Sequence, residues 1–357
     1  MSQHFRCAGV GFPPTSKDDQ RGAGDPKMDG LPHTLSLLTG ATQQRTLKTS
    51  IGCVGVGVHS GARTNLTLHP APAGTGIVFR RTDLAVDIPA RYDFVVDTRM
   101  CTVLGLPDRD DARIGTVEHV LAALAGCGIS NAIVAVDGPE VPILDGSAAS
   151  FVFLIDCAGT ITQEADVPVI EIVRTIRVTD SRYADGEGFV ELRPSPLGLD
   201  MAMSIDFDAA AIGRQALSLR LTPDAFRAEL ARARTFAQAT EIATLQAAGL
   251  ARGGSLDNAV VVDQARVLNP AGLRMPDEFV RHKLLDAVGD LALAGATLRG
   301  RFISHRGGHA MNNKLLRTLF ADDANWRVVT ADAAGPIMAR AVPAHQARQL
   351  QVAAAPV

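Results

Sequence analysis

The sequence is poor in aromatic residues and has no surplus of positive charge. One Trp and two Tyr occur among 357 residues, so a row of stacking side chains for single-stranded nucleic acid is not expected. Lysine and arginine number 35 against 38 acidic residues, which gives a formal net charge of −3. Such a chain has no general field that would attract polyanions. We therefore expect no nucleic-acid partner and only a local site for any anionic ligand.

Paired cysteines and long apolar runs are also lacking. The five cysteines are widely separated and form no Cys-x-x-Cys pair, so neither a disulfide framework nor a thiolate zinc site is expected. The apolar stretches are far shorter than the roughly 20 residues that span a bilayer. Pro, Asp and Lys occur near the N-terminus before an apolar run of signal-peptide length. We therefore predict a cytoplasmic protein without a transmembrane segment.

The length suggests two domains of roughly 150 residues each. Residues 1–42 are rich in Gly, Pro, Ser and Asp and lack helix or strand periodicity. We predict a disordered or non-native extension there, with Met28 as an alternative start. A charged, Pro-containing segment at residues 162–168 is the candidate linker. The predicted organisation is a first domain, a second domain and a C-terminal tail, at residues 43–165, 166–345 and 346–357.

A Gly-rich segment, residues 55–61, superficially resembles a dinucleotide-binding fingerprint. Its glycines do not follow the G-x-G-x-x-G spacing, and the next residues alternate like a strand instead of opening a helix. A turn between two antiparallel strands is the better interpretation. This interpretation argues against a nucleotide-dependent dehydrogenase.

Two segments far apart in the chain share a short pattern. Residues 117–126 and 280–289 both read Val-x-His-x-Leu-x4-Gly, with apolar residues at helical spacing and a predicted strand after each. Thr116 is the candidate N-cap of the first helix. A match this short can arise by chance. An internal repeat would instead mean two related domains, each with a histidine at the same place in its helix.

Candidate metal ligands follow from this pattern. His282 and Asp286 are four residues apart and therefore lie one turn apart on one helix face. Such a pair is most often a solvated surface pair. His119 of the equivalent helix would complete a His2Asp set across the domain interface, with a fourth position left for water. Glu118 beside it suits a general base, although an acidic residue in a first helical turn is also favoured by the helix dipole.

A wider set of motifs carries a family resemblance over about residues 43–340. These motifs are QRTLK (44–48), GVGVHSG (55–61), the long segment 116–148, RTF (234–236), GGSLDNAVVVD (253–263), DEFVRHKLLDAVGDLALAG (277–295) and GGHAMNNKLL (307–316). Together they resemble the zinc-dependent UDP-3-O-acyl-N-acetylglucosamine deacetylases of lipid A biosynthesis in Gram-negative bacteria.

The resemblance implies an α+β fold of two domains with similar topology. Each domain is then a two-layer unit, and the helices of both lie between two sheets in a β-α-α-β arrangement, with the active site at the interface. Each domain carries a small insert, at about residues 92–111 and 237–268, and the inserts form an apolar passage for an acyl chain. Gln238 stands where the family commonly has an aromatic residue, which predicts a changed passage wall.

The resemblance also implies the activity. The family hydrolyses the acetamide of UDP-3-O-((R)-3-hydroxyacyl)-N-acetylglucosamine to the free amine and acetate, the committed step of lipid A biosynthesis. It uses one Zn²⁺ per chain. The positions that match its zinc ligands are His119, His282 and Asp286.

Further roles are implied residue by residue. Glu118 matches the general base and His309 the general acid, while Asp290 matches the carboxylate that orients and charges His309. Thr235 matches a hydroxyl donor on the oxyanion side. The positions that match substrate contacts are Lys283, Phe236, Met100 and Cys101.

Two further expectations concern a catalytically silent protein and degradation of the protein in the cell. A catalytically silent protein that kept the fold would have lost these residues, yet the metal ligands and the acid-base pair are all present. The C-terminus, QLQVAAAPV, is short and apolar. It is either a frayed chain end or, as the resemblance implies, a tail on which a cytoplasmic protease acts.

Overall fold

The computed structural model describes residues 43–180 and 188–330. All of the first predicted domain and most of the second lie within these ranges. The predicted extension 1–42, the alternative start Met28 and the tail 346–357 lie outside the described residues. The domain boundaries given above stay predictions.

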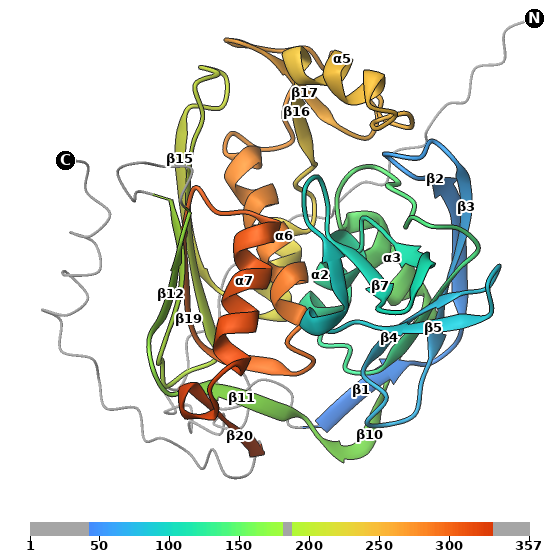
Figure 1. Ribbon diagram of the computed structural model, residues 1–357, viewed down its shortest axis with the longest axis vertical. Helices are drawn as coiled ribbons and strands as arrows, with labels where there is room; N and C mark the ends of the chain where they lie inside the picture. The colour runs from blue at the N-terminus through green and yellow to red at the C-terminus, as the bar shows by residue number, and fades with distance from the viewer. Residues whose placement is uncertain (1–42, 181–187, 331–357) are drawn as a thin grey trace, which may run out of the picture.

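Two β-sheets form the outer layers of the molecule, and the main helices lie between them (Figure 1). In β14 (Leu199–Asp206), buried and half-buried side chains alternate along the whole strand, which is the pattern of a sheet that packs on one face. Helices α2 (Glu118–Gly126) and α6 (Glu278–Ala292) are buried over most of their length. The predicted α+β fold with helices between two sheets is confirmed.

In the first half of the described chain, the first strand, β1, pairs with the last strand, β10. The other strands form a five-stranded sheet and a small three-stranded sheet. Besides α2, the elements of this half, in chain order, are β1 (Gln43–Leu47), β2 (Ile51–Val56), β3 (Arg63–Pro70), β4 (Ile77–Arg81), β5 (Val86–Pro89), η1 (Tyr92–Phe94), β6 (Val95–Asp97), β7 (Val103–Leu106), β8 (Arg109–Ile114), β9 (Ala132–Val136), α3 (Ala149–Ala158) and β10 (Thr160–Asp166).

The second half is built around the long strand β19, to which three strands pair directly. None of the helices within residues 43–180 and 188–330 has the length and hydropathy needed to cross a bilayer. The remaining elements of this half are β11 (Pro168–Ile172), β12 (Ile176–Thr179), β13 (Phe189–Arg193), β15 (Arg214–Arg220), α4 (Pro223–Ala225), the π-helical turn η2 (Phe226–Leu230), β16 (Phe236–Gln238), α5 (Ala239–Ala247), β17 (Val260–Asp263), β18 (Arg266–Val267), β19 (Thr297–His305), α7 (His309–Phe320), η3 (Asp323–Asn325) and β20 (Trp326–Thr330).

The two halves share one sheet topology. In the first, the strand order is β2-β3-β9-β4-β5, and β9 is antiparallel to β3 but parallel to β4. In the second, the order β12-β13-β19-β14-β15 repeats these directions, with β19 antiparallel to β13 and parallel to β14. Helix α2 precedes β9, and α6 precedes β19. The internal repeat predicted from the shared helix pattern is confirmed.

Small elements occupy the two segments expected to be inserts. Strands β6, β7 and β8 form a three-stranded sheet in the first half. In the second half, β16 and β17 are parallel and are connected through α5, with β18 antiparallel at the edge. Figure 1 shows this second element projecting at one end of the molecule, above α6 and α2.

The start of α2 differs from its prediction. Thr116 does not cap the helix, because its backbone is left-handed, with φ at 56°. Its hydroxyl instead donates to Oε1 of Glu140 over 3.0 Å. The same carboxylate accepts the backbone N–H groups of His59 and Ser60. Glu140 therefore joins the Gly-rich turn between β2 and β3 to the start of α2. That turn connects antiparallel strands, as predicted.

A glycine permits the close approach of α2 and α6. A Cβ at Gly289 would lie 2.0 Å from the backbone oxygen of Glu118, a distance at which the two helices would have to separate. A Cβ at Gly126, the equivalent position of α2, would instead meet the ring of Phe226 at 2.3 Å. The glycine of the repeat in α6 therefore sets how near the two helices come.

Candidate active site

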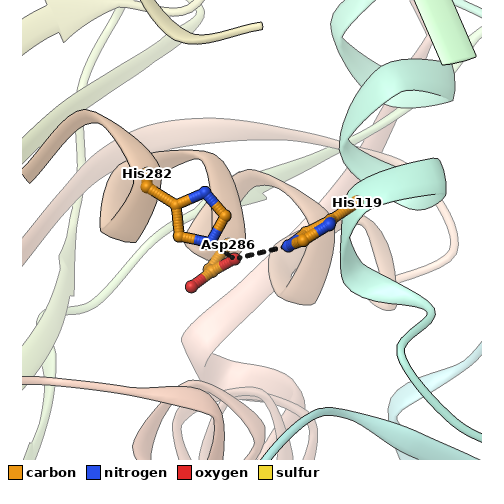
Figure 2. Close-up of side chains that lie close together, drawn as sticks. All are labelled: His119, His282 and Asp286. Carbon is orange, nitrogen blue, oxygen red and sulfur yellow. Dashed lines mark ion pairs between the residues drawn. The ribbon is translucent and has the colours of Figure 1, made fainter. Parts of the chain in front are cut away.

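The three predicted metal ligands converge between the two halves (Figure 2). His119 comes from α2, while His282 and Asp286 come from consecutive turns of α6. The Nε2 atoms of His119 and His282 lie 3.5 Å and 3.2 Å from Oδ1 of Asp286. One ligand atom from each residue lies within 4.8 Å of the others, and all three residues are buried. The surface-pair interpretation of His282 and Asp286 is therefore wrong.

The surroundings of this triad fit a metal ion. Nδ1 of His282 lies 3.0 Å from the backbone oxygen of Ala233, so Nδ1 is the donor and the Nε2 lone pair faces Asp286. Burial lowers the pKa of His119, which keeps its imidazole in the neutral form that binds metals. Oδ1 of Asp286 is buried without a hydrogen-bond donor among the described residues. A cation between this oxygen and the two imidazoles would satisfy it.

His309 and Asp290 form a second buried pair. Nδ1 of His309, the first residue of α7, lies 2.9 Å from Oδ2 of Asp290. Burial opposes a charged imidazole, but the attraction of Asp290 outweighs it and raises the pKa of His309 to about 9. The imidazole is therefore protonated at pH 7. Asp290 also accepts the hydroxyl of Thr102 at 2.6 Å and the side-chain amide of Asn312 at 2.9 Å.

Glu118 is the first residue of α2 and is 4% exposed. Burial raises the pKa of its carboxyl to about 7, although the charge of His309 opposes the shift. The backbone N–H of Thr102 donates to Oε2 over 3.1 Å. A carboxyl with this pKa can accept and release a proton near neutral pH.

One cavity of about 880 Å³ joins these groups. All the predicted site residues line it except Asp290, which lies behind His309. One wall is apolar and comes from the element that contains α5 and β17. Its large aliphatic side chains are Ile242, Leu245, Leu256 and Val261.

Residues predicted to contact the substrate surround the triad. The ring of Phe236 lies edge-on to Phe279, with 5.0 Å between centroids, and the amine of Lys283 lies 5.7 Å from the Phe236 centroid. Lys283 also pairs with Oδ2 of Asp286 at 3.2 Å. Burial raises the pKa of Asp286, but His282 and Lys283 outweigh it and hold that pKa well below its usual range.

The other predicted contacts come from loops at the cavity wall. Thr235 precedes β16, and its backbone is held by Gly146 and Val260. Met100 is 43% exposed, whereas Cys101 is buried. Burial raises the pKa of the Cys101 thiol, so this side chain is neutral at the wall of the cavity.

Comparison with known proteins places the chain in a family. A family model described as UDP-3-O-acyl N-acetylglycosamine deacetylase matches residues 44–321. The chain belongs to this family. The UDP-3-O-acyl-N-acetylglucosamine deacetylase of Anaeromyxobacter sp. is 49% identical over 295 residues, which cover 82% of this chain and 94% of the relative. Those of Idiomarina loihiensis and Myxococcus xanthus are 48% and 49% identical, over 81% of this chain and 94% and 90% of the relatives.

Gln238, which stands where the deacetylase family commonly has an aromatic residue, lies at a different cavity from the one expected. Gln238 is not among the residues that line the main cavity. It lines a second cavity of about 500 Å³, together with Lys283 and Arg306. Gln238 therefore lies at this second cavity, and its effect on the wall of an acyl passage stays a prediction.

Other residues of this deacetylase site escaped the sequence analysis. Arg234 and Glu278 form a buried pair with 2.8 Å between Nε and Oε1, and the same carboxylate accepts the backbone N–H of Arg234. The pair fixes the segment that supplies the Ala233 oxygen and Thr235. Arg234 and Glu278 both lie in motifs of the family resemblance, but no spacing rule pairs them.

Proposed function

We propose that the chain removes acetate from UDP-3-O-((R)-3-hydroxyacyl)-N-acetylglucosamine in the cytoplasm, with one Zn²⁺ held by His119, His282 and Asp286. This reaction leaves the free amine and is the committed step of lipid A biosynthesis. The observation that carries the proposal is the convergence of these three side chains from the two halves, in one cavity with Glu118 and His309.

The donor set suits this metal. Two imidazole nitrogens and one carboxylate oxygen are common ligands of catalytic zinc, which keeps one position open. When bound, the ion supplies a Lewis acid and lowers the pKa of water. The orientation of His282 by the Ala233 oxygen and the neutral state of His119 support this assignment.

Glu118 serves as the general base. With a pKa of about 7, its carboxyl is partly ionised at neutral pH, so it takes a proton from the attacking water as the oxygen of that water adds to the acetyl carbonyl carbon. Its place in the first turn of α2, directly before His119, brings it beside the triad without making it a ligand.

His309 serves as the general acid. Asp290 keeps its imidazole protonated at pH 7, and His309 gives this proton to the amine nitrogen as the C–N bond breaks. The positive charge also stabilises the oxyanion that develops on the carbonyl oxygen, together with the hydroxyl of Thr235. An amide needs such help because an amine leaves poorly without a proton.

The cavity has an apolar wall for the acyl chain of the substrate and a charged side chain for its polar end. The aliphatic wall from α5 and β17 suits the acyl chain. Lys283 offers a positive charge toward the polar end, and Phe236 offers an aromatic face. Met100 and Cys101 complete the wall on the side of the first half.

The experiment that tests this function is acetate release from the 3-hydroxymyristoyl substrate by metal-stripped protein, before and after one equivalent of zinc. Activity restored by zinc would support substrate, reaction and metal together. Bound zinc without activity would contradict the substrate assignment. No zinc bound would favour a silent protein that kept the fold.

Degradation of this protein by a cytoplasmic protease that acts on its C-terminal tail stays a prediction. The C-terminal residues that it concerns lie outside the described part of the chain. Cellular half-lives of the full chain and of a variant without the last ten residues would be compared. We expect the truncated chain to persist longer, and equal half-lives would contradict the prediction.

A further inference from the structure

We infer that Thr102 is a positioning residue that fixes Glu118 and Asp290 relative to each other across the two halves. Its hydroxyl donates to Oδ1 of Asp290 over 2.6 Å, and its backbone N–H donates to Oε2 of Glu118 over 3.1 Å. Thr102 directly precedes β7 and is 1% exposed. The inference rests on the proposed function, which makes Glu118 the base and Asp290 the partner of the acid.

The hydrogen bonds to Asp290 have a fixed direction. The side-chain amide nitrogen of Asn312 can act only as a donor, so Oδ2 of Asp290 is an acceptor. Thr102 is the donor to Oδ1, whereas His309 and Asn312 are the donors to Oδ2. Because both oxygens are engaged, the carboxylate cannot rotate, and His309 keeps its direction toward the cavity.

The backbone of Thr102 acts on Glu118 in a similar way. Its N–H engages Oε2, so Oε1 is left to exchange the proton with the attacking water. The backbone oxygen of Thr102 also accepts the N–H of Val117 at 3.5 Å. Thr102 therefore contacts both the first turn of α2 and the Asp290 carboxylate of α6.

Packing alone does not require a hydroxyl at this position. Valine has nearly the shape of threonine, with a methyl group in place of the hydroxyl. Its presence would leave Oδ1 of Asp290 buried without a donor, and bonds to charged groups are the strong ones. Thr102 does not line the cavity. Loss of the hydroxyl should therefore slow the chemical step without weakening substrate binding.

The test compares Thr102→Val with Thr102→Ser in the zinc-loaded full chain. We expect Thr102→Val to lower kcat by roughly 10- to 100-fold, the effect of losing one hydrogen bond to a charged group. KM and bound zinc should stay within about twofold of wild type, because neither cavity wall nor ligand changes. Thr102→Ser keeps the hydroxyl and should restore kcat to within about threefold.

A matched control is Thr46→Val. Thr46 is 2% exposed, its hydroxyl donates to the backbone oxygen of Asn131 over 2.7 Å, and it does not line the cavity. This variant should lose thermal stability but keep the wild-type kcat. Wild-type kcat in Thr102→Val would overturn the inference. Equal loss in Thr102→Val and Thr102→Ser would also overturn it, because the methyl packing and not the hydroxyl would then matter.

A second readout separates this inference from the proposed function. Failure of the wild-type chain to release acetate would contradict the function alone. The proton on Nδ1 of His309 can still be followed by NMR, with its signal assigned from its absence in His309→Ala. We expect this signal to move in Thr102→Val and to stay in Thr102→Ser and Thr46→Val. An unmoved signal in Thr102→Val would overturn the positioning role.

Discussion

Helices α2 and α6 occupy equivalent places in the two halves, yet only α6 carries carboxylates in the turns after its histidine. Counted from that histidine, Asp286 and Asp290 correspond to Ala123 of α2 and to Cys127, which directly follows α2. Ala123 and Cys127 are buried in the apolar core. The same backbone topology therefore occurs twice, but the side chains at equivalent positions differ. The two helices thus supply different residues to one site.

The residues before the two histidines differ as well. Glu118 of α2 lines the cavity, whereas Arg281 of α6 is tied to Asp277 and Glu229, with only 16% of its side chain exposed. In the proposed mechanism, the base therefore comes from one helix, and the partner of the acid comes from the other. This arrangement separates the two proton-transfer groups on different elements.

The largest effect on kcat is expected at the position before the histidine of each helix, where α2 has Glu118 and α6 has Arg281. Glu118→Gln should lower kcat by ~10²- to 10⁴-fold with zinc retained, because the base is lost. Arg281→Gln, the matched change in α6, should leave kcat unchanged but cost about 1–3 kcal/mol of stability, because the largely buried Arg281 side chain bonds to Asp277 and Glu229. Steady-state kinetics and metal analysis check both. Near wild-type turnover in Glu118→Gln would exclude its role as base.

The next effect concerns the metal. His282→Ala should reduce zinc affinity by at least ~100-fold, because losing a ligand should exceed the 10- to 100-fold cost of losing an outer partner. Competition with a chelator of known affinity measures this change. His119→Ala, the matched change in α2, should behave similarly. A fully metallated His282→Ala protein would remove this residue from the ligand set.

A smaller effect is expected at the glycines of the repeat. Gly289→Ala would push α2 and α6 apart, because the new Cβ meets the backbone of Glu118. We expect a loss of kcat of about 100-fold, the order found when reacting groups shift by about 1 Å. Gly126→Ala meets the Phe226 ring and should cost about 1–3 kcal/mol of stability while kcat is kept. Kinetics and thermal unfolding distinguish the two, and equal kinetic losses would contradict this difference.

The smallest effect concerns the pH dependence. Glu118 must be ionised, so activity should rise with pH through its pKa of about 7. His309 must be protonated, so activity should fall as pH rises through its pKa of about 9. Asp290→Asn removes the attraction that raises the His309 pKa. The alkaline limb of kcat should therefore move down by about one pH unit or more, and an unmoved limb would contradict the role of Asp290.

Much of the fold was predictable because its signals are local or repeated. The amphipathic pattern that ends at Gly289 predicted α6, and the shared pattern around His119 and His282 predicted the repeat. The prediction failed at Thr116, whose hydroxyl type suits an N-cap. A distant carboxylate, Glu140, recruits this hydroxyl and holds the backbone in a left-handed conformation.

The site was predictable only in part. His282 and Asp286 follow from helix spacing, but their burial does not, and it required the second helix. Thr102 lies next to Cys101, which the family resemblance named, yet its partner Asp290 is 188 residues away. Such contacts depend on how the two halves dock. No local pattern carries that information.

A bound ion with ligands from both halves would also be a cross-link. His119 and His282 are separated by 163 residues (282 − 119), and both can hold the ion only while α2 and α6 are docked. By linkage, an ion present at a hundredfold excess over its dissociation constant stabilises the docked state by about 2.7 kcal/mol. Chelation should therefore lower the melting temperature and speed amide exchange in α2 and α6 where they contact each other. The docking of the two halves would then depend on the same ion as catalysis.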